Sequence, residues 1–230
     1  MIISHKYKFI FIKTEKTAGT SIEIALSEFC GPNDIITPIT RPDEMIRKSM
    51  GYRGPQHYLA PLFSYGPRDL AFFVLKGKKK KRYYNHINAT EIRKSIGDDI
   101  WKNYFKFCFE RNPWDRVVSF YYWCNKKEPR QTLREFIDSN KSFRLRKRGY
   151  HAYTIDGTIA VDKICRYENL EEEMKDLTDR LNLPKIPVLP RAKSNIRLDK
   201  RHYRKILNDE EKKIIEKMFE KEIRLFGYEF

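Results

Sequence analysis

Lysines and small hydroxyl side chains gather directly after a short apolar run near the start of the chain. The cluster consists of Lys13, Thr14, Lys16, Thr17, Gly19, Thr20 and Ser21. Residues 7–12 predict a buried strand, and apolar side chains recur at helical spacing over residues 22–29. A loop between a strand and a helix N-terminus binds anions well, because its N–H groups and the helix dipole point at the ligand. The spacing therefore predicts a site for a doubly charged anion; the alternative is a polar turn that only caps the helix.

This corner differs from the nucleotide-binding loop of ATPases. With Lys16 as the motif lysine, the pattern G-x-x-x-x-G-K-[ST] needs glycines at the two positions that here hold Ile10 and Glu15. In this chain the lysine comes first and Gly19 follows it. The order indicates a different ligand that is still anionic.

A second segment with the same layout occupies residues 107–123. An apolar strand ends at Arg111, Pro113 enforces a turn, and a helix follows. Helical spacing places on one face of that helix Arg116, Ser119 and Trp123. An arginine at a strand end with a serine on the next helix suits a phosphate, whereas the alternative is an ion pair of Arg111 with Glu110 or Asp115. Two anion sites at one sheet edge favour a nucleotide with phosphates at both ends.

The rest of the chain alternates between strand and helix patterns. Further strands are expected at residues 70–75, 104–110 and 162–166. Helices are expected at residues 43–50, 88–97, 115–125, 132–139, 169–181 and 208–226. Such alternation favours an α/β fold with a mostly parallel β-sheet flanked by helices. Because no repeat or linker divides the chain, we expect a single domain over residues 1–230.

The composition narrows the class of protein. The 230 residues carry a formal net charge of +16, which favours anionic partners such as nucleotides, nucleic acid, acidic polysaccharide or a membrane surface. None of the four cysteines lies in a C-x-x-C pair, so we expect reduced thiols and no metal. No run approaches the ~20 apolar residues of a membrane span, and we expect a soluble, cytoplasmic protein.

The two anion motifs together resemble a known family. K-T-A-G-T-S at residues 16–21, followed by R-N-P-W-D-R-V-V-S at residues 111–119, resembles the carbohydrate-type sulfotransferases, and in particular the bacterial members related to heparan sulfate 2-O-sulfotransferase. The resemblance extends through H-I-N-A-T-E-I, C-R-Y-E-N-L-E, L-P-R-A-K-S-N, H-Y-R and the terminal F-G-Y-E-F. These pieces span nearly the whole chain in the family's order.

The resemblance implies a nucleotide-kinase-like fold and 3′-phosphoadenosine 5′-phosphosulfate (PAPS) as donor, with adenosine 3′,5′-bisphosphate (PAP) as product and no metal. It implies that the 5′-phosphosulfate loop consists of Lys16, Thr17, Ala18, Gly19, Thr20 and Ser21. It also implies that Arg111 and Ser119 hold the 3′-phosphate, with further contacts from Lys193 and Arg197 in a late loop. Many relatives have proline where this chain has Glu15, whose carboxylate should point away from the sulfate.

Sulfuryl transfer requires a base for the acceptor proton and a cation for the leaving oxygen. Lys16 is expected to supply the cation. His86 lies 25 residues before Arg111, and its placement is similar to that of the catalytic histidine of the 2-O-sulfotransferases. We expect His86 to be the base; His57, or a histidine that only caps the helix, is the alternative. Trp114 is expected in the core, with stacking on adenine as the alternative.

The acceptor is expected to be a hydroxyl on a carbohydrate. The basic residues 77–82 and 141–148 could together line a cleft for an acidic glycan, or form ordinary surface. Neutral sugars, lipid-linked sugars and small metabolites stay open as acceptors. The rival functions are an ATP-dependent phosphotransferase of similar fold, a basic nucleic-acid-binding protein, and a relative that binds the nucleotide without catalysis. A surface that binds nucleic acid would interleave aromatic and basic residues. Only Tyr83 and Tyr84, beside the basic run, suggest such a pattern, so we expect no nucleic-acid partner.

Overall fold

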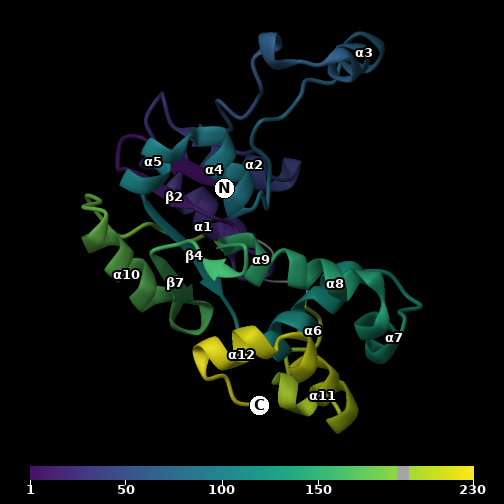
Figure 1. The fold of residues 1–230 in the computed structure, drawn as a ribbon. Coiled ribbons are helices and arrows are strands. Elements are labelled where there is room, and N and C mark those ends of the chain that lie inside the picture. The colour runs from purple at the N-terminus through teal and green to yellow at the C-terminus, as the bar shows by residue number, and fades with distance from the viewer. Residues whose placement is uncertain (191–196) are drawn as a thin grey trace.

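The computed structural model of the chain describes residues 1–190 and 197–230, and it centres on a mixed β-sheet (Figure 1). Its strands are β1 Ile2–Ser4, β2 Phe9–Phe11, β3 Ile35–Ile36, β4 Phe105–Glu110 and β7 Lys163–Arg166. They lie in the order β3-β1-β2-β4-β7. β2 pairs in parallel with β4, and β4 with β7, whereas β1 runs antiparallel to β2 and β3. A separate hairpin pairs β5 Thr154–Ile155 with β6 Thr158–Ile159.

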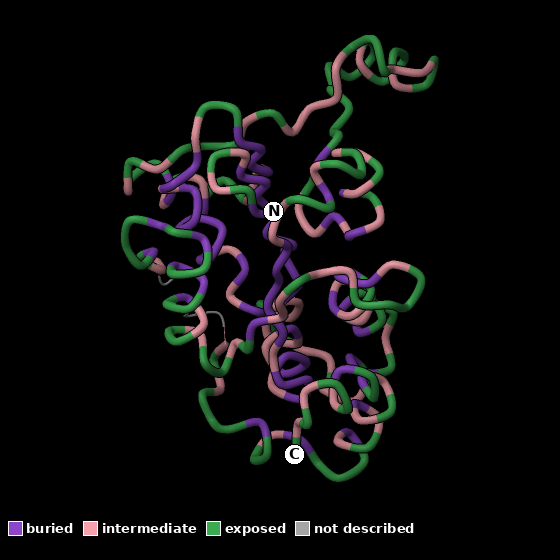
Figure 2. The backbone as a smooth tube through the Cα atoms, turned by 60° about the vertical axis from the view of Figure 1, so that its left-hand side comes forward, coloured by how far each residue is buried: buried purple, intermediate pink, exposed green. Residues whose placement is uncertain are grey.

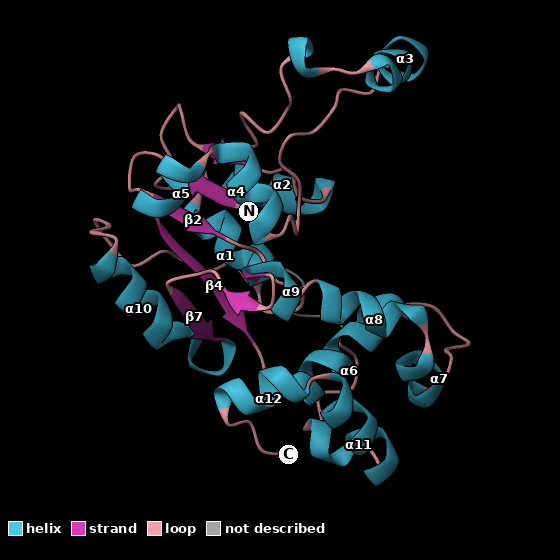
Figure 3. Ribbon diagram, viewed as in Figure 1, coloured by secondary structure: helices cyan, strands magenta, loops and turns pink. Residues whose placement is uncertain are grey.

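Helices surround this sheet in the described residues (Figure 3). Those at or before the second motif are α1 Gly19–Leu26, α2 Arg41–Ser49, α3 Pro67–Lys76, α4 Ala89–Ile96, α5 Asp98–Asn103 and α6 Pro113–Cys124. Those after it are α7 Leu133–Asp138, α8 Asn140–Lys147, α9 Tyr150–Tyr153, α10 Leu170–Arg180, α11 Asp209–Met218 and α12 Glu220–Phe226. The expected α/β architecture is confirmed.

The two central strands are buried on both faces because neighbouring side chains alternate between two cores. Phe9, Phe11, Phe107 and Phe109 point to one face, where they pack against apolar side chains of α1 and α10. Ile10, Ile12 and Cys108 point to the other face, where α4, α5 and α9 cover them. A third core joins α6 to α7, α11 and the C-terminus around the buried Trp114. Trp114 is thus a core residue, as expected, and stacking on adenine is wrong.

Two predicted elements are wrong in type or extent. Residues 70–75, predicted as a strand, belong to helix α3, in which Pro67 occupies the first turn and Asp69 accepts a hydrogen bond from the N–H of Gly66. The predicted helix over residues 208–226 is broken at Phe219 into α11 and α12. The short strands β1 and β3 were not predicted, so the sheet is less uniformly parallel than expected.

The segment containing α3 stands apart from the rest of the molecule (Figure 1). We call residues 58–82 the arm. Its two ends pair, since Leu59 and Lys81 form an antiparallel bridge and the N–H of Ala60 donates to Lys80 O at 2.9 Å. Beyond this neck most of the chain is exposed, in contrast to the buried strands of the sheet (Figure 2).

Candidate active site

The lysine corner is a tight loop at the carboxyl end of β2. Lys16 and Ala18 adopt left-handed backbone conformations, with φ of 69° and 57°, and α1 begins at Gly19. No side chain caps the start of this helix. Its first N–H groups and the helix dipole are therefore directed at whatever lies before the loop, as an anion site requires.

Gly19 is required by the packing inside the loop. A Cβ atom at this position would lie 2.8 Å from Lys13 Cγ and 3.3 Å from Thr14 O. The loop is further tied to β4 by the Thr14 hydroxyl, which donates to Phe109 O and lies 2.9 Å from the Thr17 hydroxyl. Only glycine, which has no Cβ, therefore allows the start of α1 to pack this closely against the aliphatic part of the Lys13 side chain.

Lys13 belongs to the core and not to the anion site. Its Nζ lies 2.8 Å from the buried Glu23 carboxylate, which also faces the Met1 amino group at 3.1 Å. Burial alone would raise the pKa of Glu23, but Lys13, the amino group and Arg47 together lower it to about 2. The expectation that both lysines of the corner face an anion is therefore wrong for Lys13.

Lys16 points to the second motif. Its Nζ lies 5.2 Å from the centroid of the Trp123 ring on α6. Ser119 stands one turn before Trp123 on that helix and is partly exposed, and its hydroxyl forms no hydrogen bond with any residue that the structure describes. The loop lysine and this hydroxyl thus face the same side of α6.

Arg111 joins the two motifs. Its Nη1 donates to Lys16 O at 3.1 Å, and its guanidinium lies 4.1 Å from the centroid of the Tyr167 ring. Nε donates to Asp115 at 2.9 Å, so the ion pair weighed as an alternative is present. Burial would raise the pKa of Asp115, but Arg111 and Arg197 hold it below its usual value. The arginine is therefore fixed at the edge of the loop, with one face of its guanidinium covered by the Tyr167 ring.

Arg197 approaches Asp115 from the other side. Its Nη1 donates to Asp115 Oδ1 at 2.5 Å, so two arginines share one carboxylate beside the loop. Arg197 thus lies beside Arg111, while its expected contact with the donor stays a prediction. Lys193 lies outside the described residues.

Arg116 was placed on the face of Ser119 and Trp123, but its side chain is buried beneath the loop. Its guanidinium donates to Glu110 Oε2 at 2.7 Å and to Glu15 O at 2.8 Å. Burial raises the pKa of Glu110 to about 7, against the opposing charge of Arg116. Arg116 therefore supports the loop from behind and is not in position to contact a ligand.

Glu15 is buried, yet its carboxylate is fully engaged. It accepts hydrogen bonds from Arg144 at 2.7 and 3.3 Å and lies 3.5 Å from the Arg148 guanidinium. The N–H of Glu15 also donates to Arg148 O at 3.0 Å. Burial opposes ionisation, but the hydrogen bond from Arg144 and the neighbouring positive charges lower the pKa of Glu15. This residue thus fastens the loop to the C-terminal half of α8.

His86 reaches the loop from the segment that precedes α4. Its Nδ1 lies 2.9 Å from Lys13 O. Because a carbonyl only accepts, Nδ1 carries the proton, which leaves Nε2 as the unprotonated nitrogen. Burial, reinforced by the charge of Lys13, lowers the pKa of His86 to about 3. The imidazole is therefore neutral at physiological pH and oriented by the loop backbone.

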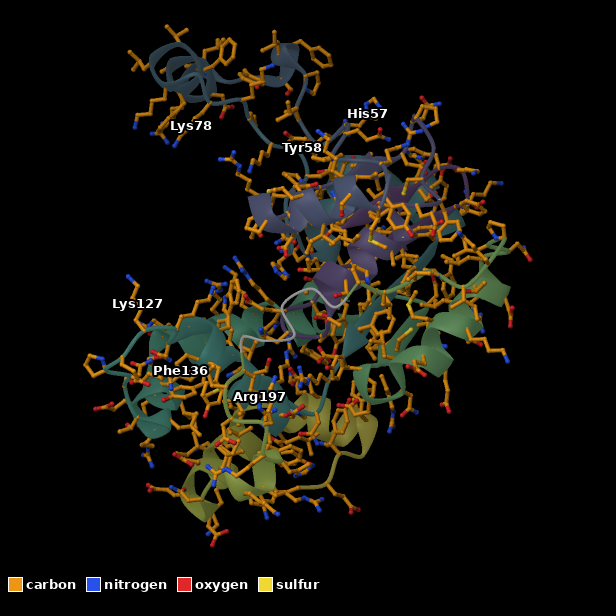
Figure 4. All side chains as sticks on the ribbon, turned by 180° about the vertical axis from the view of Figure 1, so that it is seen from behind. His57, Tyr58, Lys78, Lys127, Phe136 and Arg197 are labelled. Atoms are coloured by element: carbon orange, nitrogen blue, oxygen red, sulfur yellow. The ribbon has the colours of Figure 1, made fainter. Side chains whose placement is uncertain are left out.

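His57, the alternative base, lies elsewhere. Its side chain is exposed and contacts Pro32 O at 2.8 Å, beyond the end of α1 that is remote from the loop. Figure 4 shows it at the arm end of the molecule, well separated from Arg197. The structure brings His86, and not His57, to the lysine loop.

Basic residues 77–82 and 141–148 do not form one cleft. The first run lies in the arm, where Lys78 projects at the far end of the molecule, and the second lies in and just after α8 beside the loop (Figure 4). Sequence reasoning missed the role of Arg144 and Arg148 as partners of Glu15. An acidic side chain in an otherwise basic loop was the available signal, since a buried carboxylate requires cations.

The described part of the chain holds no group of three or more His, Cys, Asp or Glu side chains placed to bind a metal ion. Within the same ranges, no helix is both long and apolar enough to cross a bilayer.

Comparison with known proteins assigns the family. An uncharacterised protein of Archaeoglobus fulgidus is 36% identical over 99 residues, which is 42% of this chain and 82% of that protein. The crystal structure of mouse sulfotransferase SULT7A1 complexed with PAP aligns with 96% of this chain and 87% of its own, at 13% identity and a TM-score of 0.48. The sequence model of the sulfotransferase family matches residues 1–229. The chain therefore belongs to the sulfotransferase family.

Proposed function

We propose that the protein transfers the sulfuryl group of PAPS to an acceptor hydroxyl, with a carbohydrate as the expected acceptor. The observation that carries this proposal is the contact between Arg111 and Lys16 O at 3.1 Å, which joins the two anion motifs at one edge of the sheet. A donor with phosphates at both ends needs two such positive sites close together. The family assignment supplies the reaction class.

The residues around the loop fit the donor. The uncapped start of α1, with Thr17, Gly19 and Ser21, would hold the 5′-phosphosulfate, together with Ala18 and Thr20. Arg111 and Ser119 would hold the 3′-phosphate, with Arg197 and Lys193 as further contacts. Asp115 accepts hydrogen bonds from both Arg111 and Arg197 and so holds them in position. The remaining N–H groups of the two arginines would be able to donate to a bound phosphate.

The bound donor supplies an activated sulfuryl group. His86 Nε2 would accept the proton of the acceptor hydroxyl as that oxygen bonds to sulfur. Lys16 would neutralise the bridging phosphate oxygen as its bond to sulfur breaks. The proton thus ends on His86 and the negative charge ends on a phosphate oxygen beside Lys16, so the step is balanced without a metal.

A base with a pKa of about 3 is weak in the free protein. Burial is the main cause of this low pKa, and the charges of Lys13 and Arg148 add to it. An anionic donor in the loop would oppose these charges, and opposite charge nearby favours the protonated imidazole. Donor binding should therefore raise the pKa of His86, which makes it a better general base.

Calorimetric titration with PAP, and separately with ATP and Mg²⁺, tests the proposal. We expect tighter binding of PAP, weakened roughly 10- to 150-fold by Lys16→Ala or Arg111→Ala, because each removes a charge-assisted contact. Lys213→Ala, a change at an exposed lysine of α11, is the matched control and should leave affinity unchanged. Preference for ATP with Mg²⁺ would favour the phosphotransferase alternative, and unchanged affinity in both variants would refute the site.

A further inference from the structure

The arm is a separately folded projection. Beyond its paired neck, the 3-10 turn Leu62–Ser64 and helix α3 are held together by contacts within the arm. Tyr65 and Phe73 pack edge to face at 6.1 Å, and the Tyr65 hydroxyl accepts from the N–H of Lys80 at 2.8 Å. The tip thus has a defined shape although it stands clear of the sheet and its helices (Figure 1).

The tip presents apolar side chains to solvent. The exposed large apolar residues of the arm are Leu62, Phe63, Leu70, Phe72, Val74 and Leu75. Phe63 is 91% exposed, Leu75 80% and Val74 77%. Helix α3 has no buried residue. So many exposed large apolar side chains within one short segment are typical of an interaction surface, whereas single exposed apolar residues are ordinary.

The same tip is strongly basic. Residues 58–82 contain seven Lys or Arg and one acidic residue, Asp69, giving a net charge of +6 (7 − 1). Asp69 is paired with Lys80 at 2.7 Å. Within the described residues, no ion pair involves Lys78, Lys79 or Lys81. Figure 4 shows Lys78 projecting at this end of the molecule.

We propose that the arm docks the protein on an anionic lipid surface. Phe63, Val74 and Leu75 require an apolar environment, and the lysines after Gly77 require negative charge; a bilayer with acidic headgroups supplies both within one interface. Nucleic acid or an acidic glycan would supply charge but no apolar phase. A second copy of this chain would bring its own net charge of +16, which opposes association with the basic tip.

Co-sedimentation of the full chain with lipid vesicles tests this inference. We expect binding to vesicles that combine phosphatidylcholine with phosphatidylglycerol, and at least about tenfold weaker binding to phosphatidylcholine alone. Lys78→Glu/Lys79→Glu should weaken binding by about 25-fold or more, because each basic residue near such a surface contributes about fivefold. Phe63→Ser/Leu75→Ser should weaken it by about tenfold or more.

Matched controls separate the arm from general surface charge. Lys213→Glu/Lys217→Glu makes the same charge change on α11, and Met45→Ser removes a comparably exposed apolar side chain from α2; both should bind vesicles as the wild type does. Equal binding by the arm variants, or no binding of the wild type to anionic vesicles, would overturn the inference. So would an arm-dependent dimer in sedimentation velocity without lipid. PAP affinity should be unchanged in every one of these variants, because none of them touches the candidate site, so this test is independent of the proposed function.

Discussion

Glu15 occupies the loop position at which an acidic side chain looks least compatible with an anion. The structure explains its presence, because Arg144 and Arg148, far along the chain, pair with the carboxylate and neutralise it. The same residue fastens α8 to the loop through its backbone. A residue that departs from the family's motif therefore holds the loop in place through tertiary contacts. It does so although α8 is far from the loop in sequence.

Replacing Glu15 should weaken both folding and donor binding. Glu15→Ala leaves Arg144 and Arg148 without their carboxylate, and we expect a loss of about 1–3 kcal/mol in the free energy of unfolding, measured by chemical denaturation. PAP affinity should fall with it, because the loop loses its anchor. Glu128→Ala, which breaks an exposed pair with Arg130, is the control and should change stability little.

The Glu15 contribution also has a defined pH dependence. Its folded-state pKa lies below the ordinary value of 4.5, so the stabilisation is present above that value and is lost as pH falls through the lower folded-state pKa. As pH falls below the ordinary value of 4.5, the stability of the wild type should therefore fall more steeply than that of Glu15→Gln, in which this dependence is absent. Parallel acid titration curves for the two proteins would contradict the assignment.

His86 should be essential for turnover and dispensable for donor binding. His86→Ala is expected to lower kcat by roughly 10²- to 10⁴-fold, the usual contribution of a general base, while PAP affinity changes little. Imidazole NMR should show Nδ1 protonated and a pKa that rises from about 3 when PAP binds. Full turnover by the variant, or a pKa that PAP does not move, would eliminate His86 as the base.

The low pKa of His86 also makes the stability of the protein depend on pH, in this case because burial keeps the imidazole neutral. The unfolded chain takes up a proton below about pH 6.5 while the folded state does not, so stability falls as pH falls. Between about pH 7 and pH 5 this group should account for about 2 kcal/mol. His86→Asn should lose that part of the pH dependence in urea titrations, and an unchanged slope would contradict the low pKa.

At the scale of elements, the site depends on two parallel strands that end together. β2 and β4 are neighbours in register, Phe11 opposite Phe107, so the segments that follow them meet. The contact of Thr14 with Phe109 O and that of Arg111 with Lys16 O then lock the two loops into one surface.

The junction of β2 and α1 should be sensitive to a single methyl group. Gly19→Ala would place Cβ 2.8 Å from Lys13 Cγ, whose stem is held by the ion pair with Glu23. We expect a loss of about 1–3 kcal/mol in thermal unfolding and weaker PAP binding, since the helix start must shift. Gly54→Ala is the control, because its Cβ would meet nothing within 4 Å. Equal behaviour of the two variants would show that the loop adapts.

At the scale of the whole molecule, a body and an arm can be distinguished (Figures 1 and 2). The body contains the three apolar cores and every described residue of the candidate site. No residue from Leu59 to Arg82 in the arm belongs to any of these cores. That residues 1–230 form a single domain stays a prediction. The arm is an insertion between β3 and α4 whose ends already pair.

Removal of the arm should leave the body intact. Ala60 and Lys80 are hydrogen-bonded across the neck at 2.9 Å, so a short Gly-Ser turn can replace residues 61–79 without stretching the chain. We expect the thermal unfolding midpoint and the PAP affinity to change little, and vesicle binding to be lost. A large drop in the midpoint would show that the arm supports the body, contrary to its exposure.

The sequence by itself determined the strand–loop–helix units, the positions of Lys16, Gly19 and Arg111 at strand ends, and most helix limits. These follow from local chemistry: residues 88–97 were correct because Asn88 caps α4 and Gly97 ends it. The strand patterns at residues 7–12 and 104–110 are confirmed as β2 and β4, whereas the order of the strands came from the structure.

Only the tertiary structure decided which charges face the site. Lys13 and Lys16 are of one type and three residues apart, yet one pairs with Glu23 in the core and the other lies over Trp123. The same holds for Arg116, for Glu15 and for the choice of His86 over His57. The direction of a long charged side chain depends on partners distant in sequence. Pattern and spacing carry no record of such long-range contacts, so these features were decided by packing.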